Sequence, residues 1–285
     1  MKDFDLTIII ISWQVRDLLN RCLASIYQET RGIKFEVIVV DNASTDQTAE
    51  MVAEFYPQAV IIANLKNRGF ARAGNQGLKQ ARGNHILLLN PDTIIIGRAV
   101  ERMVEFLNNH PEAGIAGCKI LNADQSIQPS VRKFPTLPDQ LLMLFKLHHF
   151  IKLKDYLLLG FDYQASAEVD QVMGAFFMIN GLAREKIGLL DEQFYIWFEE
   201  VDYCRRCRQA GFKIVYTPLA SVIHLGGQSF SQKFQLKNQW NFSQSRCRYF
   251  LKYHGFLPFL VIFILTPVSL LLTLFGWLIN FKNAR

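Results

Sequence analysis

Short, continuous apolar runs alternate with longer mixed stretches over the first 95 residues of the chain. LTIIIIS (6–12), FEVIVVD (35–41) and HILLLNPDTII (85–95) are rich in aliphatic and β-branched residues, as the buried strands of a parallel sheet are. AVIIAN (59–64) predicts a further short strand. The intervals have the composition of helices, so strand and helix alternate four times.

This alternation predicts an α/β fold with a doubly wound, mostly parallel sheet and helices on both of its faces. In such sheets, ligands bind at the carboxyl ends of the strands. Asp41 and Asp92 both lie at these ends, which makes them the first candidates for a functional role.

The middle of the chain is less regular. Residues 130–168 mix apolar side chains with lysines and histidines, and they predict either an amphipathic segment on a membrane surface or a surface helix packed on the core. EVDQVMGAFFMIN (168–180) and GFKIVYTP (211–218) predict two further strands. SVIHLGGQSF (221–230) predicts a loop that carries His224.

The C-terminal part contains no charged residue between His254 and Lys282. As a helix this stretch would be about 40 Å long, enough to cross a hydrocarbon core of roughly 30 Å. Pro258 and Pro267 interrupt the helix pattern, so Gly255–Phe281 predicts either a kinked span or a re-entrant hairpin, with a buried core helix as the other alternative.

More basic residues precede this apolar run than follow it, which favours a cytoplasmic main domain. The apolar run at the N-terminus is too short for a signal peptide and agrees with that location. We therefore predict a catalytic domain over residues 1–245, and a basic juxtamembrane segment with a membrane anchor over residues 246–285.

Composition and charge argue against two classes of function, nucleic-acid binding and zinc binding. The net charge of +6 is spread along the chain and forms no basic stripe, so we expect no nucleic-acid partner. Five cysteines are scattered, and the pair Cys204 and Cys207 has no second pair that would complete a zinc site. We interpret this pair as two reduced thiols on one face of a helix.

Two strand ends carry candidate chemistry. In NPD (90–92), a carboxylate held in a turn offers a hard oxygen ligand to Mg²⁺ or Mn²⁺, with diphosphate oxygens completing the shell; a capping Asp is the alternative. In DNASTD (41–46), Asp41 precedes the helix-capping residues, and its carboxylate can accept a hydrogen bond from a nucleobase imide.

A glycine-rich segment, NRGFARAGNQG (67–77), lacks the spacing of a dinucleotide fingerprint or a P-loop. This argues against a dinucleotide oxidoreductase and against a P-loop kinase.

The stretch YIWFEEVDYCRR (195–206) places three acids, Glu199, Glu200 and Asp202, among aromatic residues. Burying charges among apolar groups is costly unless the charges are paired, solvated or used. Aromatic surroundings raise the pKa of a carboxyl by desolvation, which suits a general base. A solvated first turn of a helix, favoured by the helix dipole, is the alternative.

In this combination the chain resembles glycosyltransferase family 2, enzymes of the GT-A fold, and within it the rhamnosyltransferase-like branch. The resemblance covers roughly residues 6–230 and rests on IIIISW…VVDNASTD, NRGFARAGNQG, LLLNPD, GAFFMIN, FYIWFEEVDYCRRCRQAGF and VIHLGGQS. It implies a nucleotide-sugar donor (a dTDP-, UDP- or GDP-sugar) and a divalent metal ion, Mg²⁺ or Mn²⁺.

The resemblance also implies roles for individual residues. Glu200 would be the general base of an inverting transfer, although relatives commonly carry Asp at this place. Asp92 would be the metal-binding acid of a motif whose first acid is replaced by Asn90, and His224 would complete the metal shell. Asp202 would support the site from behind and pair with Arg205 or Arg206.

Two further groups of residues are implied to bind substrates. The acceptor would contact Trp197 and Glu199. The donor would contact polar residues that follow the strands or lie in the glycine-rich segment: Ser12, Asp41, Asn67, Asn75, Asn90 and Asp92.

These expectations describe a membrane-associated, inverting glycosyltransferase that moves a sugar, for example rhamnose from a dTDP donor, to a lipid-linked or polysaccharide acceptor in cell-surface glycan synthesis. A polyprenyl-phosphate sugar transferase is an alternative; it would not need Glu200 as a base, because a phosphate is already ionised. A non-catalytic, nucleotide-sugar-binding subunit of a glycan assembly complex is a second alternative.

Overall fold

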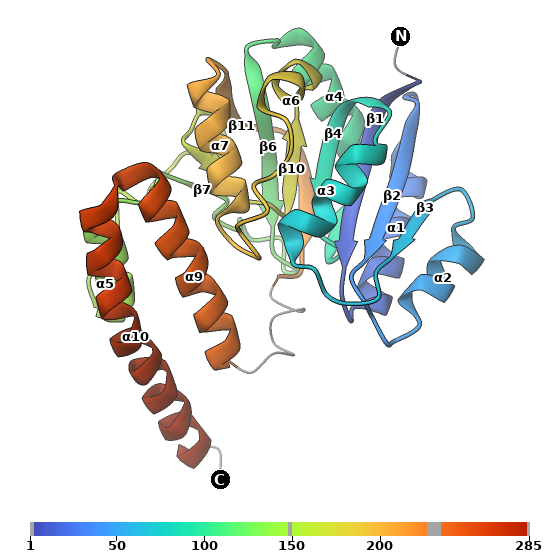
Figure 1. Cartoon of the computed structure of the whole chain (residues 1–285). Helices are drawn as coiled ribbons and strands as arrows, with labels where there is room; N and C mark the ends of the chain where they lie inside the picture. Colours follow the sequence, from blue (N-terminus) through green and yellow to red (C-terminus); the bar gives the residue numbers. More distant parts are fainter. Residues whose placement is uncertain (1–2, 148–149, 227–234, 284–285) are drawn as a thin grey trace.

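Four parallel strands from the first 90 residues form one half of a mixed sheet (Figure 1). The computed structural model describes residues 3–147, 150–226 and 235–283. The four strands lie in the order β3-β2-β1-β4 and alternate in sequence with three helices. Their bounds are β1 Phe4–Ser12, α1 Arg16–Glu29, β2 Phe35–Asp41, α2 Thr48–Phe55, β3 Val60–Ala63, α3 Phe70–Gln80 and β4 Gly83–Leu89. The predicted α/β architecture is confirmed in this half.

The other half of the sheet is mixed in direction. Strand β10 (Phe176–Ile179) runs antiparallel between β4 and β6 (Ala113–Leu121), and β6 pairs in parallel with β11 (Lys213–His224). Strand β5 (Thr93–Ile95) closes this edge antiparallel to β11. The remaining elements of this half are α4 Ala99–Asn109, β7 Val131–Arg132, β8 Ala167–Glu168, β9 Gln171–Val172, α6 Gly181–Ile187 and α7 Glu199–Gln209.

The prediction of a loop around His224 is wrong for its first part. Residues 221–224 belong to β11, where they pair with both β5 and β6, and His224 is the last residue of the strand. The alternating burial of this segment is that of a strand between two neighbours. Leu225 and Gly226 have no regular secondary structure, as predicted for a loop, and residues 227–230 lie outside the described residues.

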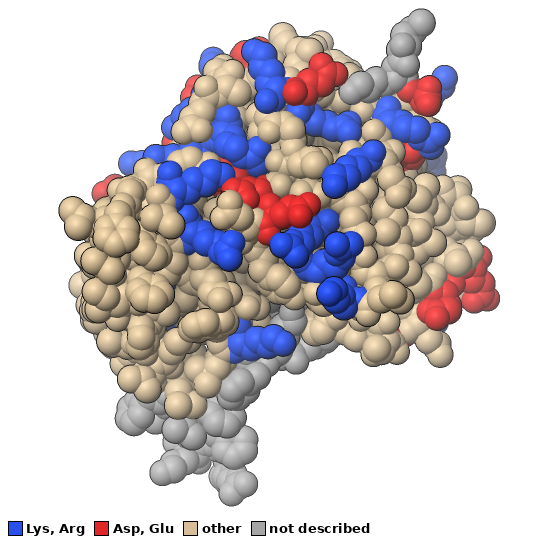
Figure 2. All heavy atoms as spheres, viewed as in Figure 1, with Lys and Arg blue, Asp and Glu red and all other residues tan. Residues whose placement is uncertain are grey.

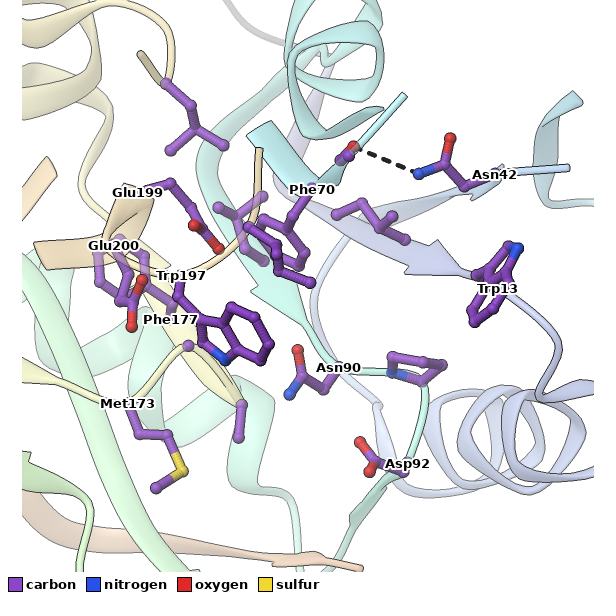
Figure 3. A pocket seen from close by; sticks show the side chains of 18 of the residues that line it. Trp13, Asn42, Phe70, Asn90, Asp92, Met173, Phe177, Trp197, Glu199 and Glu200 are labelled. Carbon is purple, nitrogen blue, oxygen red and sulfur yellow. Dashed lines mark hydrogen bonds between the residues drawn. The ribbon is translucent and has the colours of Figure 1, made fainter. Parts of the chain in front are cut away.

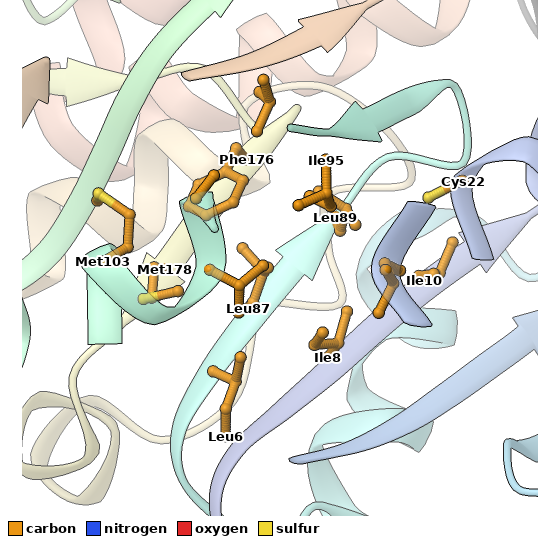
Figure 4. Close-up of a cluster of buried hydrophobic side chains, with 14 of the residues drawn as sticks. Leu6, Ile8, Ile10, Cys22, Leu87, Leu89, Ile95, Met103, Phe176 and Met178 are labelled. Carbon is orange, nitrogen blue, oxygen red and sulfur yellow. The ribbon is translucent and has the colours of Figure 1, made fainter. Parts of the chain in front are cut away.

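Side chains alternate across the sheet, and the strands therefore build two cores. Leu6, Ile8 and Ile10 of β1 face α1 and α4, together with side chains from β4 and β10 (Figure 4). Ile9 and Ile11 face the opposite side, where α3 and α7 pack. All five cysteines are free thiols, and Cys204 and Cys207 are both buried in the second core, which confirms the interpretation of this pair.

The C-terminal region is a helical hairpin that packs against α5 (Leu137–Leu144). Helix α9 (Gln235–His254) meets α10 (Phe256–Asn283) at Gly255, whose φ of +85° is readily adopted by glycine. The predicted boundary between residues 245 and 246 falls inside α9, and the division into two domains stays a prediction. Predicted features at His148 and His149 lie outside the described residues.

Helix α10 is not a core helix. Residues 256–274 are apolar and long enough to cross a membrane, by length and composition, and only 17% of this window is buried within the chain. Pro267 lies inside the helix without ending it. Pro258 lies in the first turn, where a backbone N–H would have no hydrogen-bond partner within the helix. The chain does not turn back within α10, and a broad uncharged surface covers α5 and α10 (Figure 2).

Candidate active site

A cavity of about 320 Å³ opens where the strands β1, β2 and β4 end. Its walls are largely aromatic and aliphatic, with a few polar groups that converge on the interior. Figure 3 shows Glu199 and Glu200 on one side, Trp13 on the other, and Asn90 between them. The polar and charged lining residues are Asn42, Asn67, Asn90, Asp92, Arg132, Glu199, Glu200 and His224.

The turn between β4 and β5 presents the first acid. The backbone N–H of Thr93 donates to the carbonyl of Asn90 (3.2 Å), which closes the turn around Pro91. Strand β11 pairs antiparallel with β5, with His224 opposite Thr93, so the imidazole lies beside the carboxylate of Asp92. The distance from His224 Nε2 to Asp92 Oδ1 is 3.2 Å.

A glutamine sets the tautomer of His224. Gln128 donates its amide N–H to Asn122 Oδ1 (2.8 Å), so its oxygen is the atom that faces His224 Nδ1, at 2.7 Å. Nδ1 therefore carries the proton, and Nε2, with Asp92 Oδ1 at 3.2 Å and Asn90 Nδ2 at 3.4 Å, is left as an acceptor. Two acceptor atoms at this separation repel each other unless a cation or a proton lies between them.

A carboxylate oxygen and an imidazole nitrogen, oriented by an outer hydrogen bond, are suited to Mn²⁺ or a similar divalent ion. Asp92 and His224 would hold such an ion. Within residues 3–147, 150–226 and 235–283, no group of three or more His, Cys, Asp or Glu side chains gathers around one point. Most of the coordination shell would therefore come from substrate oxygens and water.

The acid pair follows a strained segment. Trp197 and Phe198 adopt φ values of +63° and +69°, which non-glycine residues adopt only when the surrounding structure holds them there. Phe198 is buried against Phe242 and Tyr249 of α9, and Ser245 donates to the carbonyl of Ile196 (2.8 Å). Helix α9 thus shapes the pocket wall that carries Trp197 and the start of α7.

Glu199 and Glu200 are held differently. Each has one carboxyl oxygen, Oε2, that is buried and has no hydrogen-bond partner among the described residues. Burial, and then the neighbouring Glu200, raise the pKa of Glu199 well above its usual value. Burial also raises the pKa of Glu200, but backbone N–H groups and Arg132 oppose this rise. The pKa values of both acids are thus raised, and Arg132 stabilises the carboxylate of Glu200 against this effect.

Asp202 lies behind the pocket, as predicted, and joins two helices. Its side chain is fully buried and accepts hydrogen bonds from Arg206 Nε (2.8 Å), Lys252 Nζ (2.6 Å) and Tyr253 Oη (2.7 Å). Of the two predicted partners, Arg206 makes the ion pair, and Arg205 lies over the ring of Tyr253. This network fixes α7 relative to α9.

The glycine-rich segment packs directly on the residues before the acids. Asn67 Oδ1 accepts from the N–H of Gly69 (3.0 Å), the hydroxyl of Tyr195 (2.8 Å) and the amide of Asn42 (3.1 Å). Gly69 has a φ of +83°, and a Cβ at this position would lie 2.6 Å from the Tyr195 ring. The oxygen of Asn67 is thus committed to the fold, and only its amide nitrogen remains for the predicted donor contact.

Three predicted donor residues do not line the pocket. Asp41 is buried at the end of β2 and accepts from the N–H of Ser44 (3.3 Å); burial raises its pKa. Ser12 is buried opposite Asp41 in the parallel register. Asn75 faces inward from α3. Its amide N–H groups donate to the carbonyl of Leu190 and the carboxylate of Glu192, and its oxygen accepts from the N–H of Leu190. The position of Asn75 is that of a structural bridge, and the donor contact predicted for it has no support in the structure.

Several lining residues were absent from the prediction. Trp13 and Asn42 directly follow β1 and β2, so the rule that ligands bind at strand ends would have found them. Arg132 carries no such local signal, because it enters through the short β7–β9 ladder, whose partner strand is about 40 residues away in sequence. Tyr195 and Met173 are also lining residues.

The family model "Glycosyl transferase family 2" matches residues 7–159 of the chain. An N-acetylglucosaminyl-diphospho-decaprenol L-rhamnosyltransferase of Mycobacterium tuberculosis is 24% identical over 245 residues, which cover 77% of this chain and 75% of the relative. A low-salt glycan biosynthesis hexosyltransferase of Haloferax volcanii is 25% identical over 224 residues, covering 77% and 67%.

The fold is also that of a solved glycosyltransferase. The mannosyltransferase PcManGT from Pyrobaculum calidifontis, in complex with GDP-Man and Mn²⁺, superimposes with a TM-score of 0.58 at 17% identity. The superposition covers 95% of this chain and 73% of that structure. The predicted GT-A fold is therefore confirmed.

The raised pKa of Glu199 can be tested by measuring the thermal stability of the protein at two pH values. A carboxyl with a raised pKa binds its proton more tightly in the folded protein, so its contribution is present below the ordinary pKa of 4.5 and is lost as pH rises through the raised value. Glu199→Gln stays neutral, so its thermal midpoint should exceed that of the parent protein near pH 8 and match it near pH 5. The exposed acid Glu105 supplies the control, Glu105→Gln, which should behave as the parent. An equal offset at both pH values would contradict the raised pKa.

Proposed function

The chain belongs to glycosyltransferase family 2, and from this premise we propose that it is an inverting enzyme that transfers a sugar from a nucleotide-diphosphate donor to a lipid-linked acceptor in cell-surface glycan synthesis. The observation that carries the proposal is the acid pair Glu199 and Glu200, whose free carboxyl oxygens share one cavity with Asp92 and His224. A deoxyhexose such as rhamnose is the proposed sugar, because the Mycobacterium tuberculosis relative is named as a rhamnosyltransferase.

The donor is proposed to bind over the carboxyl ends of β1, β2 and β4. Asp41 lies beside the lining residues Trp13 and Asn42, in a position to support the nucleoside. Asp92 and His224 would hold Mg²⁺ or Mn²⁺, which, when bound, stabilises the charge of the departing diphosphate. The PcManGT complex with GDP-Man and Mn²⁺ supports this part of the proposal.

The acceptor is proposed to bind on the Trp197 side of the cavity. Glu200 takes the proton from the acceptor hydroxyl, and the hydroxyl oxygen forms the new bond to the anomeric carbon of the donor sugar. The bond from that carbon to the diphosphate oxygen breaks on the opposite face. Burial raises the pKa of Glu199 well above its usual value, and in its protonated form Glu199 can donate a hydrogen bond to a neighbouring acceptor hydroxyl. Trp197 offers a ring for the acceptor sugar to stack on.

A lipid-linked acceptor accounts for the C-terminal region. The name of the Mycobacterium tuberculosis relative contains a sugar-diphospho-decaprenol, which is such an acceptor. Helix α10 exposes an apolar surface that includes Leu257, Phe263 and Leu271. We propose that α10 anchors the enzyme in a membrane, with the catalytic domain on the cytoplasmic side, where Arg246, Arg248 and Lys252 precede the apolar run.

Glu200→Gln should lower the rate of sugar transfer by about 10²- to 10⁴-fold, because the acceptor hydroxyl loses its general base. Donor affinity should stay unchanged, since Glu200 lies on the acceptor side. Transfer is measured by product formation from labelled donor with the purified full chain, and Glu105→Gln is the matched control. Full activity in Glu200→Gln, with a polyprenyl phosphate serving as acceptor, would instead favour a polyprenyl-phosphate sugar transferase.

The pH dependence tests the role of Arg132. Glu200 is active when deprotonated, and burial raises its pKa, so kcat/KM should fall on the acid side at a pH above the usual carboxyl range. Arg132 opposes this rise. Arg132→Gln should therefore move the acid limb of the profile to higher pH. An acid limb at the same pH in both proteins would show that Arg132 does not act on Glu200.

Removal of the metal tests Asp92. Donor binding, measured as thermal stabilisation with dTDP-, UDP- and GDP-sugars, should require Mn²⁺ or Mg²⁺ for one nucleotide class. Asp92→Asn should lose the metal-dependent part of this stabilisation, whereas Asp41→Asn should weaken binding with and without metal. Stabilisation of Asp92→Asn by donor and Mn²⁺ to the same extent as the parent protein would place the metal elsewhere.

A further inference from the structure

Two basic side chains, one on helix α9 and one bonded to that helix, lack a carboxylate partner among the described residues. Arg246 of α9 has only 1% of its surface exposed, and Lys146 follows α5 and is part buried. Within the described residues, no ion pair joins either cation to a carboxylate. Burial lowers the pKa of Arg246 to about 10, and burial and the charge of Arg246 lower the pKa of Lys146.

Few polar partners compensate the buried guanidinium. Arg246 Nη2 donates one long hydrogen bond to Ser243 Oγ (3.4 Å), and its Nε has no partner among the described residues. Lys146 Nζ donates to Gln239 Oε1 (3.2 Å), and Gln239 in turn donates to Ser269 Oγ of α10 (3.3 Å). A buried, uncompensated charge is unfavourable, so this cluster is incomplete without an anion.

The cluster lies directly behind the acceptor side of the pocket. The rings of Trp197 and Phe242 are 5.8 Å apart, and the Arg246 guanidinium carbon is 5.5 Å from the same Phe242 ring. One aromatic side chain therefore separates the cation from the pocket wall. Ser245, the neighbour of Arg246, is bonded to the carbonyl of Ile196 in that wall.

An apolar surface lies on the other side of the cluster. Phe150 and Ile151, soon after Lys146, are exposed, and so is the outward face of α10 (Figure 2). Contacts thus connect the proposed sugar-binding wall at Trp197, through Phe242, to Arg246, and they connect Lys146, through Gln239, to the apolar helix α10. A lipid whose sugar is attached through a phosphate carries a sugar, a charged group and an apolar chain in the same order.

We propose that Arg246 and Lys146 bind the phosphate that links the acceptor sugar to its lipid. The inference rests on the proposed function, since it assumes a lipid-linked acceptor, and it adds the residues that would distinguish such an acceptor from a glycan without phosphate. A guanidinium binds phosphate through two parallel hydrogen bonds, and the ammonium group of lysine adds a second charge. Lys146 is part exposed, so its ammonium group can be reached from the surface of the protein.

The test is equilibrium binding to the purified full chain in neutral detergent, so that it does not depend on transfer. Polyprenyl diphosphate and the corresponding polyprenol, which lacks phosphate, are the probes. The parent protein should bind the diphosphate at least tenfold more tightly. Arg246→Met, which removes the charge and keeps much of the length, should lose most of this preference, and Arg248→Met, an exposed arginine of the same helix, should keep it.

Three outcomes overturn the inference: equal affinity of the parent protein for the two probes, an undiminished preference in Arg246→Met, or displacement of the bound diphosphate by phosphatidylglycerol in the same detergent micelles as readily as by unlabelled polyprenyl diphosphate, which would mean a general lipid-headgroup site. Because Arg246 is uncompensated without ligand, Arg246→Met should melt no lower than the parent. If that variant does not fold, Lys146→Met tests the same loss of preference at a part-exposed position. Lipid-diphosphate binding without sugar transfer would contradict the proposed function alone.

Discussion

The packing of residues 195–198 between the glycine-rich segment and α9 is the constraint on which the site depends. Gly69 leaves just enough room for Tyr195, and the burial of Phe198 against α9 holds two consecutive residues in the left-handed region. This strained segment directs Trp197 and the first turn of α7 into the cavity. The C-terminal hairpin therefore supports the candidate active site from outside the cavity, because α9 supplies the surface against which the segment is fixed.

The opposite wall depends on strand pairing rather than on strain. Asp92 follows β4, and His224 ends β11, more than 130 residues later in the sequence. The antiparallel pairing of β11 with β5 brings these two side chains within 3.2 Å, and Gln128 bonds the imidazole through Nδ1, so that Nε2 is the ring nitrogen beside the carboxylate. Strand pairing thus sets the distance between the carboxylate and the imidazole, which suits the metal site that we propose.

Both the cavity and the C-terminal cluster contain buried groups that the protein itself does not satisfy. The carboxyl oxygens of Glu199 and Glu200 and the guanidinium of Arg246 are each unfavourable in the free protein. Ring contacts connect Trp197, which lies two residues before Glu199, through Phe242 to Arg246. The two cores on the faces of the sheet stabilise the fold in which these unsatisfied groups occur.

The sequence by itself predicts the α/β fold from the alternation of apolar runs, and it predicts the candidate acids from their positions directly after those runs. It also shows that α10 is apolar. These features can be recognised in the sequence because each depends on residues that are neighbours along the chain. The tertiary structure alone decided how the distant residues meet. It made His224 a strand residue beside Asp92, assigned Asn75 to a structural bridge, and brought Arg132 into the pocket and Arg246 behind it. These outcomes depend on sheet order and helix packing between segments far apart in sequence, which no local pattern of hydrophobic and polar residues specifies.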